Sequence, residues 1–498
     1  MQAASLIRAA EQTQTPWRYR LDELAWRDLV QALAHDRLPF AGLWCDGQDM
    51  HALFLPDGQP LAATVALEDG RYPALSPVRP VSSLYERAAY DLYGAEAMWA
   101  VDVRPLLDHD VWQASTPLAQ APGLAGGHKG LVRFQPSEQF LHGAGDVDGW
   151  GPATGGMAPP LHVRLALQGG RILRAESQTG YAHRGLALRW RNTRLDEACR
   201  LSSRVSAGVS VAHQVAFCMA VENACGVLAA AETGLLRVAL LEMERVSHHL
   251  YTLAKLARLA GADVLASRSM GLRETLLAAI APVTGSRLLM DVCQPGGVRL
   301  AETMRMGELC GQVCDLAQGR IPALASAWRD YPGLGARLAS LGAITRDDVG
   351  QLGLEGLVAR ASGGDCDHRR AMPSYAGLWR YTSAKRHGTA EDRAFLLLDE
   401  VVESLRMLGI AADQLGLAAA GYVDCQADSA EGAAMVEGPW GPVLYWVRLS
   451  QGRVAHVFQH GPEQAALLLF ENALSGHSVE DLPLLACSLG VNAAALDA

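Results

Sequence analysis

Three long stretches with apolar residues at helical spacing constrain the fold of this chain most strongly. Between residues 211 and 228 apolar residues recur every three or four positions, and the remaining faces are also apolar or small, which predicts a buried helix. Similar stripes cover residues 236–256 and 395–408. Glu, Arg, His and Lys interrupt the second of them, so it does not have the composition of a membrane span. The sequence therefore predicts a bundle of helices packed inside the protein.

Two hairpin patterns flank this helical region. Residues 161–178 read as two strands joined at Gln168, Gly169 and Gly170, and residues 442–462 return to hairpin-like alternation. We therefore expect a mainly helical domain over residues 151–498, with a β-hairpin at each end.

The first part of the chain has a mixed pattern. Residues 1–112 contain a helical stripe, three short strands that each close in a glycine turn, and a helix that begins at an N-cap Ser83 and stops at Gly94. Residues 113–150 are rich in Gly, Gln, Pro and Ser and read as a linker. The predicted fold class is α+β, with a small α+β domain before the helical one.

Composition excludes several classes of function. The net charge of −10 argues against a nucleic-acid-binding protein. The ten cysteines form no CxxC pair, and the first twenty residues lack the apolar core of a signal peptide. Neither feature suggests a disulfide framework or secretion.

Specific motifs carry a resemblance to respiratory complexes. RYPALSPVRPVSSLYERAAYDLYG, followed by PLLDHDVW, resembles the signature of the 30-kDa-type subunit of complex I. Further motifs resemble the 49-kDa-type subunit, which is homologous to the large subunit of nickel–iron hydrogenases. In chain order these are GPATGG with LHVRL, TGYAHRG, AVEN, ERVSHHL, PGGV, VARASGGDCDHRR, EGPWGPVLYWVRL and DLPLLACSLG. The fused order resembles the large subunit of group 4 hydrogenases of the formate-hydrogenlyase and hydrogenase-4 type.

That resemblance implies four thiolate ligands in two CxxC pairs, because soft sulfur ligands hold the nickel–iron centre. In this sequence the corresponding positions carry other residues: Ser206, Val209, Asn492 and Ala495. The proton-handling glutamate of the family falls on Pro159. Cys218 and Cys225 lie seven residues apart on one apolar helix, where we expect them to pack. We therefore expect this chain to bind no metal at the family site.

The complex I branch of the resemblance implies a quinone site, and its two polar residues fall here on Ala158 and Ala207. Neither side chain can hydrogen-bond a quinone. His162 and Thr154 are nearby polar residues without a spacing argument for a role. Quinone binding in a differently lined cavity is left open.

Three retained residues are candidates for function. Arg204 matches an arginine that lies near the iron–sulfur cluster of a small partner subunit, where a fixed cation would stabilise the reduced cluster; the alternative is a simple pair with a carboxylate. His213 is either functional or a hydrogen-bonded core residue. Glu222 either belongs to a proton path or pairs with an arginine such as Arg204, because a buried carboxylate needs a partner or a proton. His183 and Arg184 are expected to shape the turn after the first hairpin and a subunit contact.

Two charged segments are expected to be structural. Residues 244–249 (ERVSHH) suit pairing four residues apart on a helix, and the adjacent histidines point in different directions, which excludes a two-histidine metal face. Residues 365–370 (DCDHRR) read as a mixed-charge loop, either solvated or bridging subunits.

The resemblance implies a subunit of a membrane-associated oxidoreductase complex, at the inner face of the cell membrane, coupled to ion translocation. Its expected partners are a small iron–sulfur subunit of the complex I 20-kDa type, a ferredoxin-like subunit and antiporter-like membrane subunits. The chain itself is expected to hold no cofactor, with quinone as a possible ligand. The alternatives are a non-catalytic scaffold in the same kind of complex, and an active nickel–iron hydrogenase with unorthodox ligands.

Overall fold

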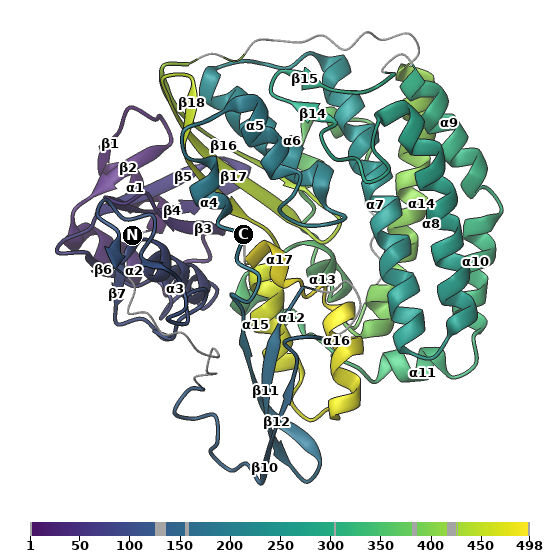
Figure 1. The fold of residues 1–498 in the computed structure, drawn as a ribbon, viewed down its shortest axis with the longest axis horizontal. Helices are drawn as coiled ribbons and strands as arrows, with labels where there is room; N and C mark the ends of the chain where they lie inside the picture. The colour runs from purple at the N-terminus through teal and green to yellow at the C-terminus, as the bar shows by residue number, and fades with distance from the viewer. Residues whose placement is uncertain are drawn as a thin grey trace.

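The fold places a small sheet on one side, a central antiparallel sheet in the middle and a group of long helices on the other side (Figure 1). Mixed helix and strand content confirms the predicted α+β class. The computed structural model describes residues 2–124, 136–154, 159–302, 305–380, 386–415, 425 and 427–496.

A five-stranded sheet in the order β1-β2-β5-β4-β3 organises the N-terminal part, with the short β1 (Glu11–Gln12) at one edge. The predicted helix is α2 (Glu23–Leu33), which begins where the Asp22 side chain accepts a hydrogen bond from the Ala25 amide. The three predicted strands are present. They are β3 (Phe40–Cys45), β4 (Asp49–Phe54) and β5 (Leu61–Ala66), and β2 (Arg18–Leu21) runs parallel to β5. Their inward faces form an apolar core of their own with α1 (Ala3–Ala9) and α2.

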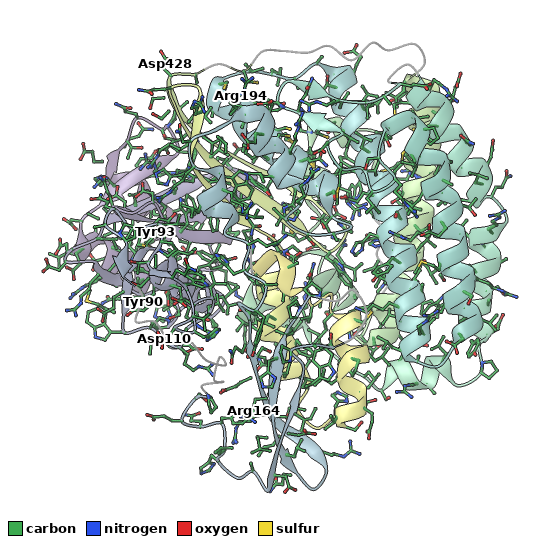
Figure 2. The ribbon with its side chains drawn as sticks, in the orientation of Figure 1. Tyr90, Tyr93, Asp110, Arg164, Arg194 and Asp428 are labelled. Carbon is green, nitrogen blue, oxygen red and sulfur yellow. The ribbon has the colours of Figure 1, made fainter. Side chains whose placement is uncertain are left out.

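Helix α3 (Ser82–Tyr93) ends at Gly94, whose φ of 75° suits the left-handed position that glycine tolerates best. The predicted N-cap is wrong, because the helix begins after Val81 and Ser83 lies inside its first turn. The Glu86 carboxylate accepts hydrogen bonds from the backbone amides of Leu75 and Ser76, which fixes the chain that leads into the helix. Tyr90 is exposed on the outer face of α3 (Figure 2).

The first hairpin is larger than predicted. Strands β11 (His162–Gln168) and β12 (Arg171–Gln178) join through Gly169 and Gly170, both with positive φ, as the sequence predicts. Strand β10 (Asp146–Trp150) pairs with β11, although the sequence placed these residues in the connector. The resulting three-stranded sheet projects from the molecule, with Arg164 on it (Figures 1 and 2).

The long helices confirm the apolar stripes. Helix α7 (Ala231–Leu259) packs between α8 (Asp263–Thr284) and α14 (Ala390–Leu415), and α9 (Met306–Ala317) packs on α8 and α14. The predicted buried helix is α6 (Ser210–Cys225), which is covered by α7 and by the central sheet. Two residues of the predicted apolar stripes are not buried. Leu228 lies beyond Gly226, where α6 ends, and is 92% exposed, and Val402 of α14 is also exposed.

The central sheet joins the two parts of the molecule. It contains β16 (Ser429–Glu437), β17 (Pro442–Ser450) and β18 (Arg453–His460), which confirms the C-terminal hairpin, and short β13 (Thr193–Arg194) at its edge. Trp44 of β3 stacks on Phe458 of β18, with ring centroids 4.7 Å apart. Arg448 donates to the Asp46 carboxylate at 2.6 Å. These contacts bind the N-terminal sheet to the larger domain.

The chain ends in α15 (Glu463–Ala473), α16 (Leu482–Ser488) and α17 (Ala493–Leu496), which return the C-terminus to the middle of the molecule (Figure 1). In the described part of the chain no helix combines the length and apolarity required to cross a bilayer.

Candidate functional site

The structure brings together two segments that lie almost three hundred residues apart. One is the loop between α5 (Leu195–Ser202) and α6, and the other is the turn before α17. The Asn492 side-chain amide donates a hydrogen bond of 2.8 Å to the Ser206 hydroxyl. The two segments that carry the family's ligand positions therefore meet in this structure, and we call their contact the junction.

The residues at this junction do not form a metal site of the family type. Val209 and Ala495 are buried in the apolar core, and the Ala495 carbonyl accepts a hydrogen bond from the Gln459 side chain at 2.9 Å. A nickel–iron centre requires thiolates that bridge two ions. The junction offers a hydroxyl, an amide and two hydrocarbon side chains, so this donor set does not fit the centre.

Arg184 ties the two segments together. Its guanidinium donates to the carbonyl oxygens of Arg204 at 2.5 Å and Val205 at 2.8 Å, and also to the carbonyl oxygen of Ala494. His183 stacks on Trp112 with ring centroids 4.6 Å apart. The sequence assigned the TGYAHRG motif to a turn and missed that its arginine joins the loop before α6 to the C-terminal segment. No local signal reveals this role, because the three acceptors are backbone groups.

Arg204 lies at the surface of the junction, with 43% of its side chain exposed. It pairs with Asp291, and its Nη2 donates to Asp291 Oδ2 at 2.7 Å. This hydrogen bond raises the pKa of Arg204, so the side chain is a fixed cation. Ala207, a few residues on, is also exposed. The other predicted quinone position, Ala158, lies outside the described residues.

His213 is fully buried on α6. The Tyr445 hydroxyl lies 3.0 Å from its Nδ1, while its Nε2 has no hydrogen-bond partner in the part of the chain that the structure describes. Burial lowers the pKa of His213 to about 3, so the ring is neutral. The structure thus places this residue as a core histidine with one free nitrogen.

Glu222 forms a buried ion pair, but with Arg237 rather than Arg204. The two carboxylate oxygens accept from Arg237 at 2.6 and 3.0 Å, and one also accepts from the Gly296 amide at 2.7 Å. Glu222 thus pairs with an arginine, as one of the two alternatives expected, but the partner is Arg237 of the neighbouring helix α7, while the arginine named as an example, Arg204, pairs with Asp291.

Residues 244–249 pair mostly with other elements, and along α7 Arg245 pairs with Glu242, three residues earlier and not four. Glu244 accepts hydrogen bonds from the Val211 and Ala212 amides at the start of α6, at 2.6 and 3.0 Å. Burial raises the pKa of Glu244 to about 8. His249 Nε2 lies 2.9 Å from a carboxylate oxygen of Glu400. The predicted pairing four residues apart is wrong, because the helix is buried and its polar groups find partners across the bundle.

A buried ion network, which we call the charged core, includes part of the DCDHRR loop. Asp367 and Arg369 are buried, so the prediction of a solvated loop is wrong for them, whereas Asp365 and Arg370 are exposed. The members of the charged core are Glu242, Arg245, Arg360, Asp367, Arg369, Glu400 and Glu437. Such a network requires every partner, because an unpaired buried charge is costly.

A helical domain packed around a junction between its first loop and its C-terminal segment is the arrangement that the resemblance to hydrogenase large subunits predicts. Residues 260–431 match the family model described as respiratory-chain NADH dehydrogenase, 49 Kd subunit. The resemblance inferred from the sequence is thus confirmed, and the chain is a relative of these complex I and hydrogenase subunits.

Individual relatives cover most of the chain. The carbon monoxide-induced hydrogenase of Rhodospirillum rubrum is 24% identical over 345 residues, which are 68% of this chain and 95% of that protein. Formate hydrogenlyase subunit 5 of Escherichia coli is 26% identical over 435 residues, 84% of this chain and 75% of that protein. A chain of the membrane-bound sulfane sulfur reductase, an archaeal respiratory membrane complex, has the same fold with a TM-score of 0.65. It is 21% identical, and the match covers 73% of this chain and all of that one.

Proposed function

We propose that this chain is a subunit of a membrane-associated oxidoreductase complex of the complex I or hydrogenase-4 type, without a nickel–iron site of its own. Electrons pass through an iron–sulfur cluster in a small partner subunit, and the reaction is coupled to ion translocation in antiporter-like membrane subunits. A ferredoxin-like subunit connects the complex to its electron donor or acceptor. The complex lies on the inner face of the cell membrane.

The observation that carries this proposal is the junction around Ser206 and Asn492. The large-subunit fold still brings its ligand positions together, while the side chains there cannot replace the four thiolates. The chain thus keeps the architecture that joins partner subunits and lacks the donors for hydrogen chemistry.

Arg204 supports the electron-transfer part of the proposal. A permanent cation, exposed beside the junction and fixed by Asp291, suits a position near a reducible cluster on a neighbouring subunit. A positive charge there stabilises the reduced, more negative cluster and raises its potential. The exposed Ala207 lies on the same loop and is where we place a quinone or other small acceptor.

The test is a redox titration of the complex purified through a tag on this chain. Arg204→Met should lower the midpoint potential of the nearest iron–sulfur cluster and slow electron transfer. Arg194→Met is the matched control, because Arg194 is also exposed and paired with an acid, Asp196, at the other end of α5. Unchanged potential and rate in Arg204→Met would contradict the electron-transfer proposal.

The second candidate function is a scaffold. It is favoured by Arg184, which fastens the junction through three backbone carbonyls and leaves the ligand positions bonded to each other. A scaffold predicts that Arg184→Met weakens assembly of the complex, and that Arg204→Met changes neither its assembly nor its electron transfer.

A further inference from the structure

A second cluster of chemically competent side chains shares no residue with the junction. Glu355 Oε1 is 3.6 Å from Cys366 Sγ, which in turn is 3.7 Å from His368 Nε2. The Glu355 Oε2 to His368 Nε2 distance is 2.7 Å. A thiol, an imidazole and a carboxylate thus place one donor atom each within 4.8 Å of one another.

The local backbone explains why these donors converge. Asp367 is in an extended conformation, with φ −146° and ψ 113°, and successive side chains of an extended chain point to opposite sides. Asp367 therefore turns into the charged core, where it pairs with Arg369 at 2.7 Å, while Cys366 and His368 share the other side. Glu355 faces them from the residue before α13 (Gly356–Ala361).

The surrounding groups hold this arrangement in place. The Cys366 carbonyl accepts from Arg360 at 3.4 Å, and the His368 amide donates to Glu437 at 3.3 Å. Both Arg360 and Glu437 belong to the buried charged core. Bonded outer groups of this kind fix the orientation of metal ligands in proteins.

We propose that Glu355, Cys366 and His368 bind a zinc ion. Cysteine sulfur, histidine nitrogen and carboxylate oxygen are the ligands that zinc uses, and three protein ligands leave a fourth position for water. With ordinary bond lengths, tetrahedral zinc holds sulfur about 3.5 Å from a nitrogen or oxygen ligand. The distances from Cys366 Sγ to Glu355 Oε1 and to His368 Nε2 agree with this value. The hydrogen-bonded contact between Glu355 Oε2 and His368 Nε2 would be replaced when both groups bind the ion.

The fourth ligand has room on the side of Glu355. Glu355 lines a partly open cavity of about 60 Å³ between the N-terminal part and the larger domain, and His460 and Trp440 line the same cavity. A cavity of this size has room for a water molecule, which needs roughly 10–15 Å³ on the same measure. The zinc ion would therefore fasten the DCDHRR loop to the start of α13, beside the contact between the two parts of the chain.

Equilibrium dialysis of the purified full chain against zinc, after removal of metal with a chelator, tests the proposal. Wild type should retain one zinc ion per chain. Cys366→Ser and His368→Gln should each lower zinc affinity by more than about 100-fold, since changes to outer groups alone cost about 10- to 100-fold. Cys314→Ser is the matched control, because Cys314 is another half-buried free cysteine, on α9 and outside the cluster, and this variant should bind zinc like wild type.

Cobalt(II) reports directly whether a thiolate of the wild-type chain binds the metal. Cobalt bound to wild type should show the near-ultraviolet charge-transfer band of a thiolate ligand, which Cys314→Ser keeps and Cys366→Ser loses. Wild type that retains no zinc, or cobalt that shows no thiolate band, would overturn the proposal. Equal zinc binding in wild type and in both ligand variants would overturn it as well.

Discussion

Asn492 donates a hydrogen bond to Ser206 across 286 residues of sequence, and this bond joins the C-terminal segment to the loop before α6. Ser206 is buried, so each of Ser206→Ala and Asn492→Ala should lower the free energy of unfolding by about 1 kcal/mol. The double variant should cost less than the sum, with a coupling energy of about 0.5–1.5 kcal/mol measured by chemical denaturation.

Ser203→Ala is the control for this cycle. Ser203 is buried on the same loop, but its hydroxyl donates to the Arg200 carbonyl at 2.8 Å. Its effect should add to that of Asn492→Ala. Additive effects for Ser206 and Asn492 would show that the bond does not form in solution.

The charged core should tolerate no missing partner. Glu400 is fully buried. Its Oε1 accepts a hydrogen bond of 2.7 Å from Arg360, and its Oε2 lies 2.9 Å from His249 Nε2. Glu400→Gln removes the charge that balances its buried partners, so we expect a loss of about 3–5 kcal/mol in unfolding free energy. The neighbouring Asp399 has a half-exposed side chain paired with Arg386, and Asp399→Asn should cost no more than about 1 kcal/mol. Similar losses in the two variants would contradict this assignment.

The free energy of unfolding should depend on pH through the buried carboxyl group of Glu463. Burial raises the pKa of this carboxyl from 4.5 to about 7, so the folded chain holds a proton that the unfolded chain releases at lower pH. This contribution is therefore complete below about pH 4.5 and is lost as the pH rises to about 7. Glu463→Gln should flatten the decline in unfolding free energy over this interval. Glu480→Gln removes an exposed acid nearby and should keep the decline, and an unchanged slope in Glu463→Gln would refute the prediction.

Elements that depend on local periodicity could be predicted from the sequence, whereas the exact start of a helix could not. The long helices and both hairpins follow from local periodicity, since a buried face repeats every three to four residues in α7 and strands alternate around Gly169. The sequence placed the N-cap of α3 at Ser83, whereas the helix begins after Val81 and no side-chain hydrogen bond caps it.

The site was accessible only through family positions. Ser206 and Asn492 have no pattern that would bring them together without the resemblance. Partners such as Arg237 for Glu222 arise from the packing of neighbouring helices, which periodicity does not specify. Cys366 and His368 lie in a segment that the sequence indicates to be a mixed-charge loop, and Glu355 joins them from a separate segment before α13.

Arg184 should stabilise the contact between the C-terminal segment, residues 491–496, and the loop before α6. Arg184→Met removes three charge-assisted hydrogen bonds to backbone carbonyls on both sides of the junction. Residues 491–496 should then exchange their amide hydrogens faster, with a loss of local stability of about 2–3 kcal/mol in hydrogen-exchange measurements. Arg189→Met is the control, because the exposed Arg189 side chain donates to the Arg184 carbonyl at 3.0 Å, within the turn after the first hairpin. Faster exchange in the loop before α6 but not in residues 491–496 would show that Arg184 holds only the first of the two segments.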